Sequence, residues 1–143
     1  MVAVGELAPD FEAPNQDGTS VKLSGMRGHP VVLYFYPKAD TPGCTIEAKG
    51  FRDHMPEFAA KNVRVVGVST DDCADQKKFA EKYGLNFTLI ADDSKAVAGK
   101  YGVLGDSGHA RRVSFLIDPH GKVVEVVDGK PEHHVDRARA VFL

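Results

Sequence analysis

Apolar and polar residues occur in blocks along the chain, and these blocks predict strands and helices in turn. Residues 31–36 (VVLYFY) form an unbroken β-branched and aromatic run, which is typical of a strand buried on both faces of a parallel or mixed sheet. Residues 63–69 predict a second central strand, and residues 87–91 predict a short third one. Residues 111–118 and 122–127 flank a Pro-His-Gly turn, so we expect them to pair as an antiparallel hairpin.

Helices are predicted between and after these strands. We expect them at residues 42–60, 73–83, 94–101 and 131–142. In the first of these helices the apolar residues that follow its start have the spacing of one inward face, which would carry Ile46, Phe51, Met55 and Phe58.

The N-terminal part of the chain predicts a hairpin. Leu7 and Phe11 are the expected anchors of an extended, proline-punctuated stretch. Residues 15–18 (NQDG) have the composition of a tight turn, and residues 19–23 can supply the strand that follows it.

This order of elements predicts the fold class. A βαβαβ arrangement followed by ββα is typical of an α/β thioredoxin-like three-layer sandwich, with a central mixed β-sheet and helices on both faces. The 143 residues suffice for one full core, so we expect a single domain over residues 1–143.

Composition excludes several classes of function. The chain is 43% hydrophobic and 27% charged, with a formal net charge of -2, so it offers no basic field for nucleic acid or an anionic membrane. Its first residues lack the pattern of a secretion signal, and no apolar run approaches the roughly 18 residues that cross a bilayer. We therefore expect a cytoplasmic protein, in which the two cysteines serve chemistry or packing rather than a disulfide scaffold.

Cys44 lies at the predicted start of the first long helix. Thr41 suits the N-cap and Pro42 the first helical position, which places Cys44 in the first turn. Unpaired backbone N–H groups and the positive end of the helix dipole favour a thiolate there over the neutral thiol. The competing interpretation is a small buried core residue, since free cysteine is often buried.

The surrounding sequence resembles the active site of a peroxiredoxin. YFYPKADTPGCT contains Pro-x-x-x-Thr-x-x-Cys (Pro37, Thr41 and Cys44), Glu47 follows three residues later, and FRD follows at residues 51–53. These residues are similar to the bacterioferritin-comigratory-protein, or Q-type, branch of the AhpC/TSA-like proteins. The resemblance extends from GELAPDFEAPNQDGTSVKLS through GVSTDD and KKFAEKYGL to SFLIDPHGKV.

The resemblance implies roles for particular residues. Cys44 would be the peroxidatic nucleophile, Thr41 would hold the peroxide and the thiolate through its hydroxyl, and Pro37 would shield the site from water. Arg112 matches the arginine that the family returns to the cysteine from a distant strand, while its neighbour Arg111 would face the other way. The N-cap role and the family role compete for the same Thr41 oxygen.

Glu47 has two interpretations. The resemblance implies that it orients an arginine from the next turn of its helix. As a bare sequence feature it could equally be a glutamate that faces solvent.

The second cysteine departs from the pattern of the branch. Many Q-type members carry a resolving cysteine five positions after the first, where this chain has Lys49. Cys73, at the start of the next predicted helix, is the remaining candidate for a Cys44–Cys73 disulfide. The alternative is a one-cysteine enzyme resolved by an external thiol. Residues 102–110 are also shorter than the corresponding loop in many relatives.

The expected function is a thiol-dependent peroxidase that reduces hydrogen peroxide and organic hydroperoxides and is recycled by thioredoxin or a similar thiol. A thiol:disulfide oxidoreductase would be expected to carry Cys-x-x-Cys, which is absent. A redox sensor or binding protein without significant turnover remains open, as does the choice between monomer and homodimer.

No cofactor and no metal are expected. His133 and His134, close to Asp136, lack a third ligand at suitable spacing, so we expect both histidines on the surface. The other four histidines fall in loops or on an exposed helix face and suggest no mechanism; they are His29, His54, His109 and His120.

Overall fold

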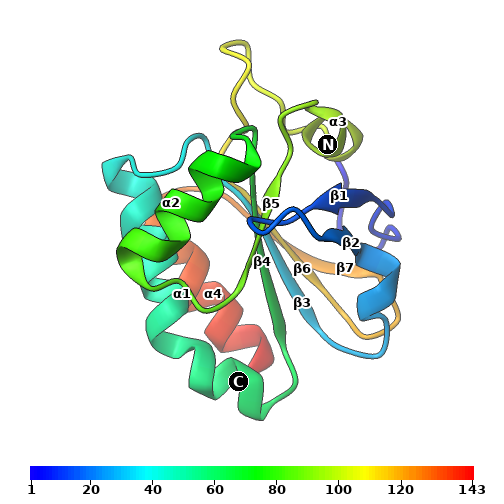
Figure 1. The fold of residues 1–143 in the computed structure, drawn as a ribbon. Coiled ribbons are helices and arrows are strands. Elements are labelled where there is room, and N and C mark those ends of the chain that lie inside the picture. The colour runs from blue at the N-terminus through cyan, green and yellow to red at the C-terminus, as the bar shows by residue number, and fades with distance from the viewer.

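A five-stranded mixed sheet forms the centre of the computed structural model, which describes residues 1–143 (Figure 1). The strand order is β5-β4-β3-β6-β7, in which β3 is parallel to β4 and antiparallel to β6. The predicted mixed sheet is therefore confirmed. The strands are β3 (Val31–Phe35), β4 (Arg64–Ser69), β5 (Thr88–Ala91), β6 (Val113–Ile117) and β7 (Val123–Val127).

Helices lie on both faces of the sheet, as predicted (Figure 1). One face is covered by α1 (Pro42–Ala60), α2 (Cys73–Tyr83) and α4 (Pro131–Phe142). The other face is covered by α3 (Ala96–Tyr101) and by a two-stranded sheet with a short 3-10 helix. These N-terminal elements are β1 (Glu12–Pro14), β2 (Ser20–Lys22) and η1 (Leu23–Met26). No helix combines the length and the apolar character needed to cross a membrane.

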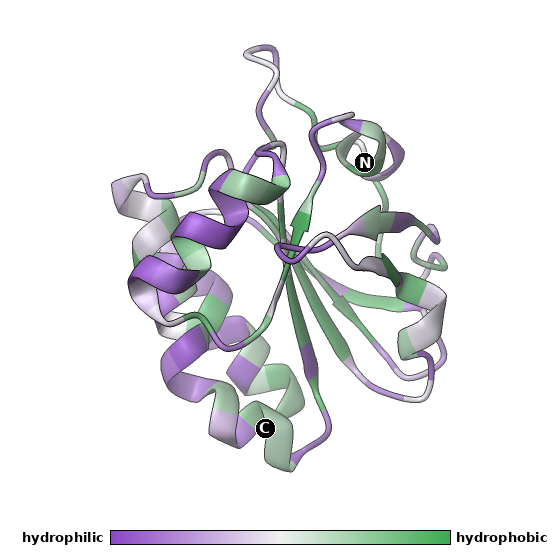
Figure 2. Ribbon diagram, in the orientation of Figure 1, coloured by the Kyte–Doolittle hydropathy of each residue, from purple (hydrophilic) through white to green (hydrophobic).

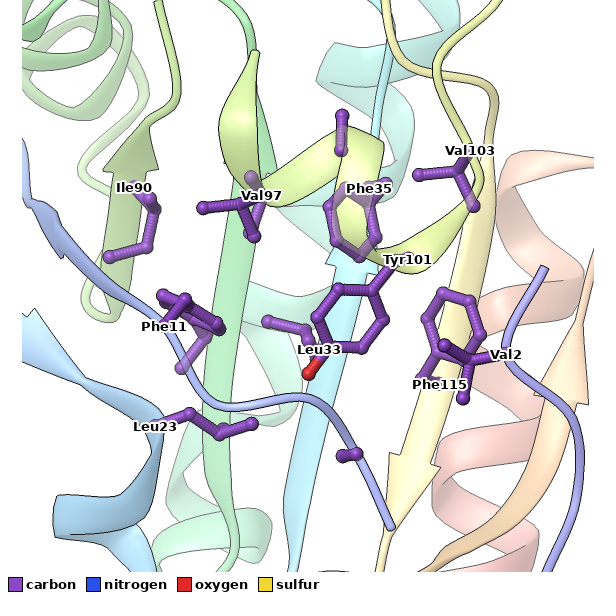
Figure 3. Packing of buried hydrophobic residues seen from close by; sticks show 14 of the residues in the cluster. Val2, Phe11, Leu23, Leu33, Phe35, Ile90, Val97, Tyr101, Val103 and Phe115 are labelled. Atoms are coloured by element: carbon purple, nitrogen blue, oxygen red, sulfur yellow. The ribbon is translucent and has the colours of Figure 1, made fainter. Parts of the chain in front are cut away.

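Strand β3 is buried along its whole length because both of its faces carry apolar side chains. Val32 and Tyr34 point toward α1, whereas Leu33 and Phe35 point to the opposite face. Figure 3 shows Leu33 and Phe35 packed among aromatic residues that include Tyr101. The hydropathy colouring shows the same division, with apolar strands inside and polar helix surfaces outside (Figure 2).

Two expected core positions are wrong. Leu7 is 58% exposed and Ile46 is 49% exposed. Each helical residue turns by about 100°, so Ile46 lies roughly 200° from Cys44 and points away from the sheet. The inward stripe of α1 instead contains Glu47 and Phe51, so a charged residue takes a place that an apolar pattern does not predict.

Helices α1 and α2 begin at the same edge of the sheet, because each follows one of the parallel strands β3 and β4. The loop before α1 is tied to α2 and to the loop that precedes it. The backbone N–H of Ala39 donates to Asp71 Oδ2 at 2.8 Å, and Asp40 accepts hydrogen bonds from Lys82 and Tyr83. These contacts hold the start of α1 in place.

Candidate active site

Thr41 occupies the N-cap position of α1, but its side chain does not cap the helix. Its backbone is extended, with φ -98° and ψ 158°, and its carbonyl accepts from the N–H of Thr45. Its hydroxyl donates to the carbonyl oxygen of Lys38 at 2.8 Å. The predicted capping bond is therefore wrong, and the N–H groups of Gly43 and Cys44 have no partner within the chain.

Cys44 is enclosed, with 1% of its surface exposed. Its thiol is not in purely apolar surroundings, because Arg112 Nη2 donates to Sγ over 3.4 Å. A packing cysteine needs no guanidinium beside it, since burying a cation is costly unless it is paired. The burial of Cys44 is thus combined with a charged partner.

Glu47 lies one turn after Cys44 and is fully buried. Its Oε1 accepts from Arg112 Nη1 at 2.7 Å, so the guanidinium joins the carboxyl group and the thiol. The solvent-facing interpretation of Glu47 is wrong. The arginine that it contacts is also not the one in the next turn, because Arg52 donates to Asp53 and to the Tyr83 carbonyl.

Arg112 reaches the site from the residue before β6, next to β3 in the sheet. Its neighbour Arg111 turns away and donates to the carbonyl of Gly102 at 2.8 Å. Burial disfavours the charged guanidinium, but Glu47 and Cys44 outweigh this and raise the pKa of Arg112 above its ordinary value. The Arg112 side chain is 18% exposed, whereas the side chain of Glu47 is fully buried.

Sequence reasoning assigned no role to two residues of this cluster, His134 and Ser114. His134 is fully buried, so its predicted surface position is wrong. Its Nδ1 lies 2.6 Å from Ser114 Oγ and 3.5 Å from Glu47 Oε2, and its Nε2 lies 3.2 Å from the carbonyl oxygen of Gly129. A helical projection of α4 would have been a usable signal, because His134 adjoins the buried Val135 on its inward face.

Burial shifts the pKa values of the carboxyl group and the imidazole in opposite directions. Desolvation raises the pKa of Glu47 from 4.5 to about 8, although Arg112 acts against this shift. Desolvation also lowers the pKa of His134 from 6.5 to about 4, although its contact with the Gly129 carbonyl opposes the shift. Both groups therefore favour their neutral forms.

Gly43 is a third residue that the sequence did not single out. A Cβ atom at this position would lie 2.9 Å from Arg112 Nη2 and 3.6 Å from Pro131 Cγ. At this distance the guanidinium would have to shift, so it keeps its position against the start of α1 because residue 43 has no side chain.

The structure places Pro37 and Cys73 at the same edge of the sheet, outside this hydrogen-bonded cluster. Pro37 is half-buried two residues after the end of β3, and Cys73 is the half-exposed first residue of α2. Both cysteines are free thiols. No group of three His, Cys, Asp or Glu side chains is arranged to hold a metal ion.

Thiol-based redox enzymes are the class of protein that this fold and this cluster define. A thioredoxin-like sheet carries a helix whose first turn presents a cysteine to unpaired N–H groups and to an arginine, an arrangement typical of redox-active cysteines.

The family follows from comparison with known sequences. Residues 4–126 match the model of the AhpC/TSA family, and the chain belongs to this family. It is 44% identical over 140 residues to peroxiredoxin Bcp of Escherichia coli, covering 92% of this chain and 90% of that protein. It is also 40% identical to chloroplastic peroxiredoxin Q of Oryza sativa, where the match covers 94% of this chain and 64% of the relative.

Solved structures agree with this assignment. The crystal structure of peroxidoxin BcpB from Mycobacterium tuberculosis matches with a TM-score of 0.94 at 40% identity, covering 99% of this chain and 97% of that one. Peroxiredoxin Q from Xanthomonas campestris matches with a TM-score of 0.86 at 32% identity, covering 92% and 89%. The predicted thioredoxin-like fold is confirmed, and the protein is an enzyme of thiol-dependent peroxide reduction.

Proposed function

We propose that Cys44 is the peroxidatic thiolate, which reduces hydrogen peroxide and organic hydroperoxides and is regenerated through Cys73 by thioredoxin or a similar dithiol protein. One observation carries the proposal. The fork of Arg112 donates from Nη2 to Cys44 Sγ at 3.4 Å and from Nη1 to Glu47 Oε1 at 2.7 Å, so the cation is held against the thiol.

The reaction follows from this geometry. The thiolate attacks one peroxide oxygen, the O–O bond breaks, and its electron pair leaves on the other oxygen, which takes up a proton. The products are a Cys44 sulfenic acid and water or an alcohol. Arg112 and the unpaired N–H groups of Gly43 and Cys44 can stabilise the charge that develops on the departing oxygen.

Thr41 orients the peroxide by accepting a hydrogen bond from it. Its hydroxyl proton is bonded to the carbonyl of Lys38, so the lone pairs of its oxygen are what it can offer to a peroxide O–H. Pro37 lies shortly after the end of β3 and limits the access of water to the Cys44 site. Because Arg112 is the partly exposed member of the cluster, we place the approach of the peroxide on its side.

Resolution requires movement of α1. Cys44 is enclosed and Cys73 is half-exposed, while both lie in first turns at one edge of the sheet. A disulfide needs Cα atoms within roughly 7 Å. We propose that the first turn of α1 unwinds, so that the Cys73 thiol attacks the sulfenic sulfur and releases water.

The test is intact mass and free-thiol count after one equivalent of hydrogen peroxide, for the wild type and for Cys73→Ser. Wild type should lose two hydrogens and both thiols, whereas Cys73→Ser should gain one oxygen. Cys44→Ser is the matched control and should not react. If wild type gains oxygen and keeps the Cys73 thiol, the enzyme works with one cysteine and an external resolving thiol. A single stoichiometric oxidation without turnover in excess thiol would indicate a sensor.

The two free thiols and the recycling by a thiol protein suit a reducing compartment, so we propose a cytoplasmic location. Cell fractionation with an antibody against the chain would test this location.

A further inference from the structure

Five polar side chains form a continuous buried cluster between α1, β6 and α4. Arg112 joins Cys44 to Glu47, the second oxygen of Glu47 faces His134, and His134 is bonded to Ser114. Cys44, Glu47, Ser114 and His134 are all buried, and Arg112 is only partly exposed. The proposed peroxide reaction uses Cys44 and Arg112 but gives no role to the other end of this cluster.

The charges of the cluster do not balance once Cys44 is a thiolate. Arg112 is then a single cation in contact with two acidic groups, Cys44 and Glu47. If both were ionised, the enclosed site would carry an uncompensated negative charge, which is costly in a desolvated environment. One additional proton makes the cluster neutral.

The remaining neighbours do not supply that balance. Tyr34 from β3 faces Glu47 and Cys44, but its hydroxyl is fully buried, and this burial raises its pKa well above the ordinary value of 10, so it stays neutral. His133 and Asp128 lie near His134, where Asp128 favours and His133 disfavours a charged imidazole. His133 is exposed, on the solvent side of α4.

The hydrogen bonds indicate where the additional proton lies. A carbonyl oxygen can only accept, so the contact with Gly129 places a hydrogen on His134 Nε2 and leaves a lone pair on Nδ1. The Ser114 hydroxyl donates to this lone pair at 2.6 Å, and Glu47 Oε2 is buried with no hydrogen-bond partner at 3.5 Å from the same nitrogen. An ionised Oε2 would therefore be buried without a donor, whereas a protonated carboxyl group is neutral and costs less to bury. The raised pKa of Glu47 and the lowered pKa of His134 agree with a proton on the carboxyl group.

We propose that Glu47, kept beside a neutral His134, holds one proton that balances the charge of the Cys44 thiolate and is released when Cys44 is oxidised. The balanced step is Cys44–S⁻ + Glu47–COOH + ROOH giving Cys44–SOH + Glu47–COO⁻ + ROH. The proton lost by Glu47 equals the proton gained by the departing oxygen. His134 is a positioning residue, held by Ser114, that acts through Glu47 on Arg112. This inference rests on the proposed role of Cys44.

Proton stoichiometry tests the proposal. Cys73→Ser protein, which stops at the sulfenic acid, is mixed with hydrogen peroxide at pH 7 in weak buffer with a pH indicator. Ultraviolet absorbance first measures thiolate in the reduced protein. The inference predicts a Cys44 thiolate and almost no net proton uptake. Adding Glu47→Gln should raise uptake to about one proton for each Cys44 oxidised, because the departing oxygen must then take its proton from solvent. The control Glu81→Gln, at an exposed site on α2, should match the parent.

The outcomes separate the two proposals. No oxidation of Cys44 means that the proposed function fails. Oxidation with uptake of about one proton in the parent overturns the inference, as does a neutral Cys44 thiol in the reduced parent.

Infrared spectroscopy adds a measurement that does not depend on a substitution. The carboxyl band of a protonated glutamic acid should disappear on oxidation of the parent, and its absence from the reduced parent would contradict the proposal. His134→Gln should increase proton uptake, because the amide can donate to Oε2 and favour the ionised carboxylate. Substitution of the exposed neighbouring residue, His133→Gln, should leave proton uptake unchanged. Equal uptake in the two variants would show that His134 has no role in holding the proton.

Discussion

Arg112 is the residue on which the geometry of the site depends. Its planar fork contacts the Cys44 thiol and the Glu47 carboxyl group at once, and the same two contacts fix its orientation. A lysine is a point charge on a flexible stem, so it cannot reproduce two divergent donors. The pairing with Glu47 thus matters as much as the charge itself.

Arg112→Lys should therefore slow the oxidation of Cys44 by peroxide. Loss of one charge-assisted hydrogen bond costs about 1.5–3 kcal/mol, which corresponds to about a 10- to 150-fold lower rate. Alkylation of Cys44 by iodoacetamide should fall less, because this reaction does not need a stabilised departing oxygen. Arg111→Lys is the matched control, since Arg111 contacts the Gly102 carbonyl instead. Equal effects of the two variants would show that Arg112 does not act on the peroxide.

At the scale of elements, the start of α1 is where several separate segments meet. Gly43 lies against Arg112 from the approach to β6 and against Pro131 at the start of α4. The loop before α1 is held by Asp71 and by α2. The first turn of α1 thus depends on contacts from the rest of the fold more than on its own capping.

Gly43→Ala should slow peroxide oxidation of Cys44 in the same way as a substitution of Arg112. The added Cβ would lie 2.9 Å from Arg112 Nη2, so the guanidinium must move away from Cys44. We expect peroxide oxidation to slow by about 10-fold, while unfolding changes little, because alanine suits a helix better than glycine by about 0.5–1 kcal/mol. Stopped-flow oxidation and thermal unfolding measure both. Gly99→Ala in α3, where a Cβ meets open space, should stabilise the protein and leave oxidation unchanged.

Formation of the Cys44–Cys73 disulfide should unfold the beginning of α1. Hydrogen exchange of residues 45–48 should become faster in the oxidised protein, and α2 should change only near its first turn, because Asp72 caps α2 through Asp75 N. Oxidised Cys73→Ser should retain the slow exchange of the reduced protein. Unchanged protection of α1 in the disulfide form would contradict the proposed unwinding.

At the scale of the whole molecule, the sheet separates an apolar core from a core that contains the reactive cluster. The face that carries α3 and the N-terminal hairpin packs a cluster of apolar and aromatic side chains (Figure 3). One charged residue, Asp92, is buried at the start of α3. The face that carries α1, α2 and α4 encloses charged groups beside its aromatic residues. The stability of the molecule should therefore depend on pH through this second face.

The free energy of unfolding of Cys44→Ser, which lacks the titrating thiol of the cluster, should fall between about pH 6.5 and 8. Above pH 4.5 the folded state keeps a proton on Glu47 that the unfolded state loses, so stability falls as pH rises toward about 8. His134 has the opposite effect between about pH 4 and 6.5, because only the unfolded state charges it there. The two effects cancel up to pH 6.5, and above it Glu47 alone costs at most about 2 kcal/mol.

Urea unfolding at a series of pH values measures this dependence. Adding Glu47→Gln to Cys44→Ser should remove the fall between pH 6.5 and 8, because glutamine does not titrate. A stability of Cys44→Ser that stays constant over this range would show that Glu47 is already ionised in the folded protein.

Local patterns along the sequence were sufficient for the elements and for the position of Cys44 at the start of a helix. The β-branched run that became β3, the Thr-Pro-Gly-Cys start of α1 and the turn between β6 and β7 all depend on neighbouring residues, whose conformational preferences are set locally. The exposure of Ile46 follows from the register of α1 on the sheet. That register places the charged Glu47 inward, which an apolar pattern does not predict.

The sequence by itself determined the order of strands and helices, the peroxiredoxin resemblance and the cysteine at a helix start, because each of these features depends on short runs of adjacent residues. Only the tertiary structure decided that Arg112 meets Cys44 and Glu47, that Thr41 donates to Lys38, and that His134 is buried behind them. These contacts join residues from α1, β6 and α4, and their burial and charge arise only when the helices pack on the sheet.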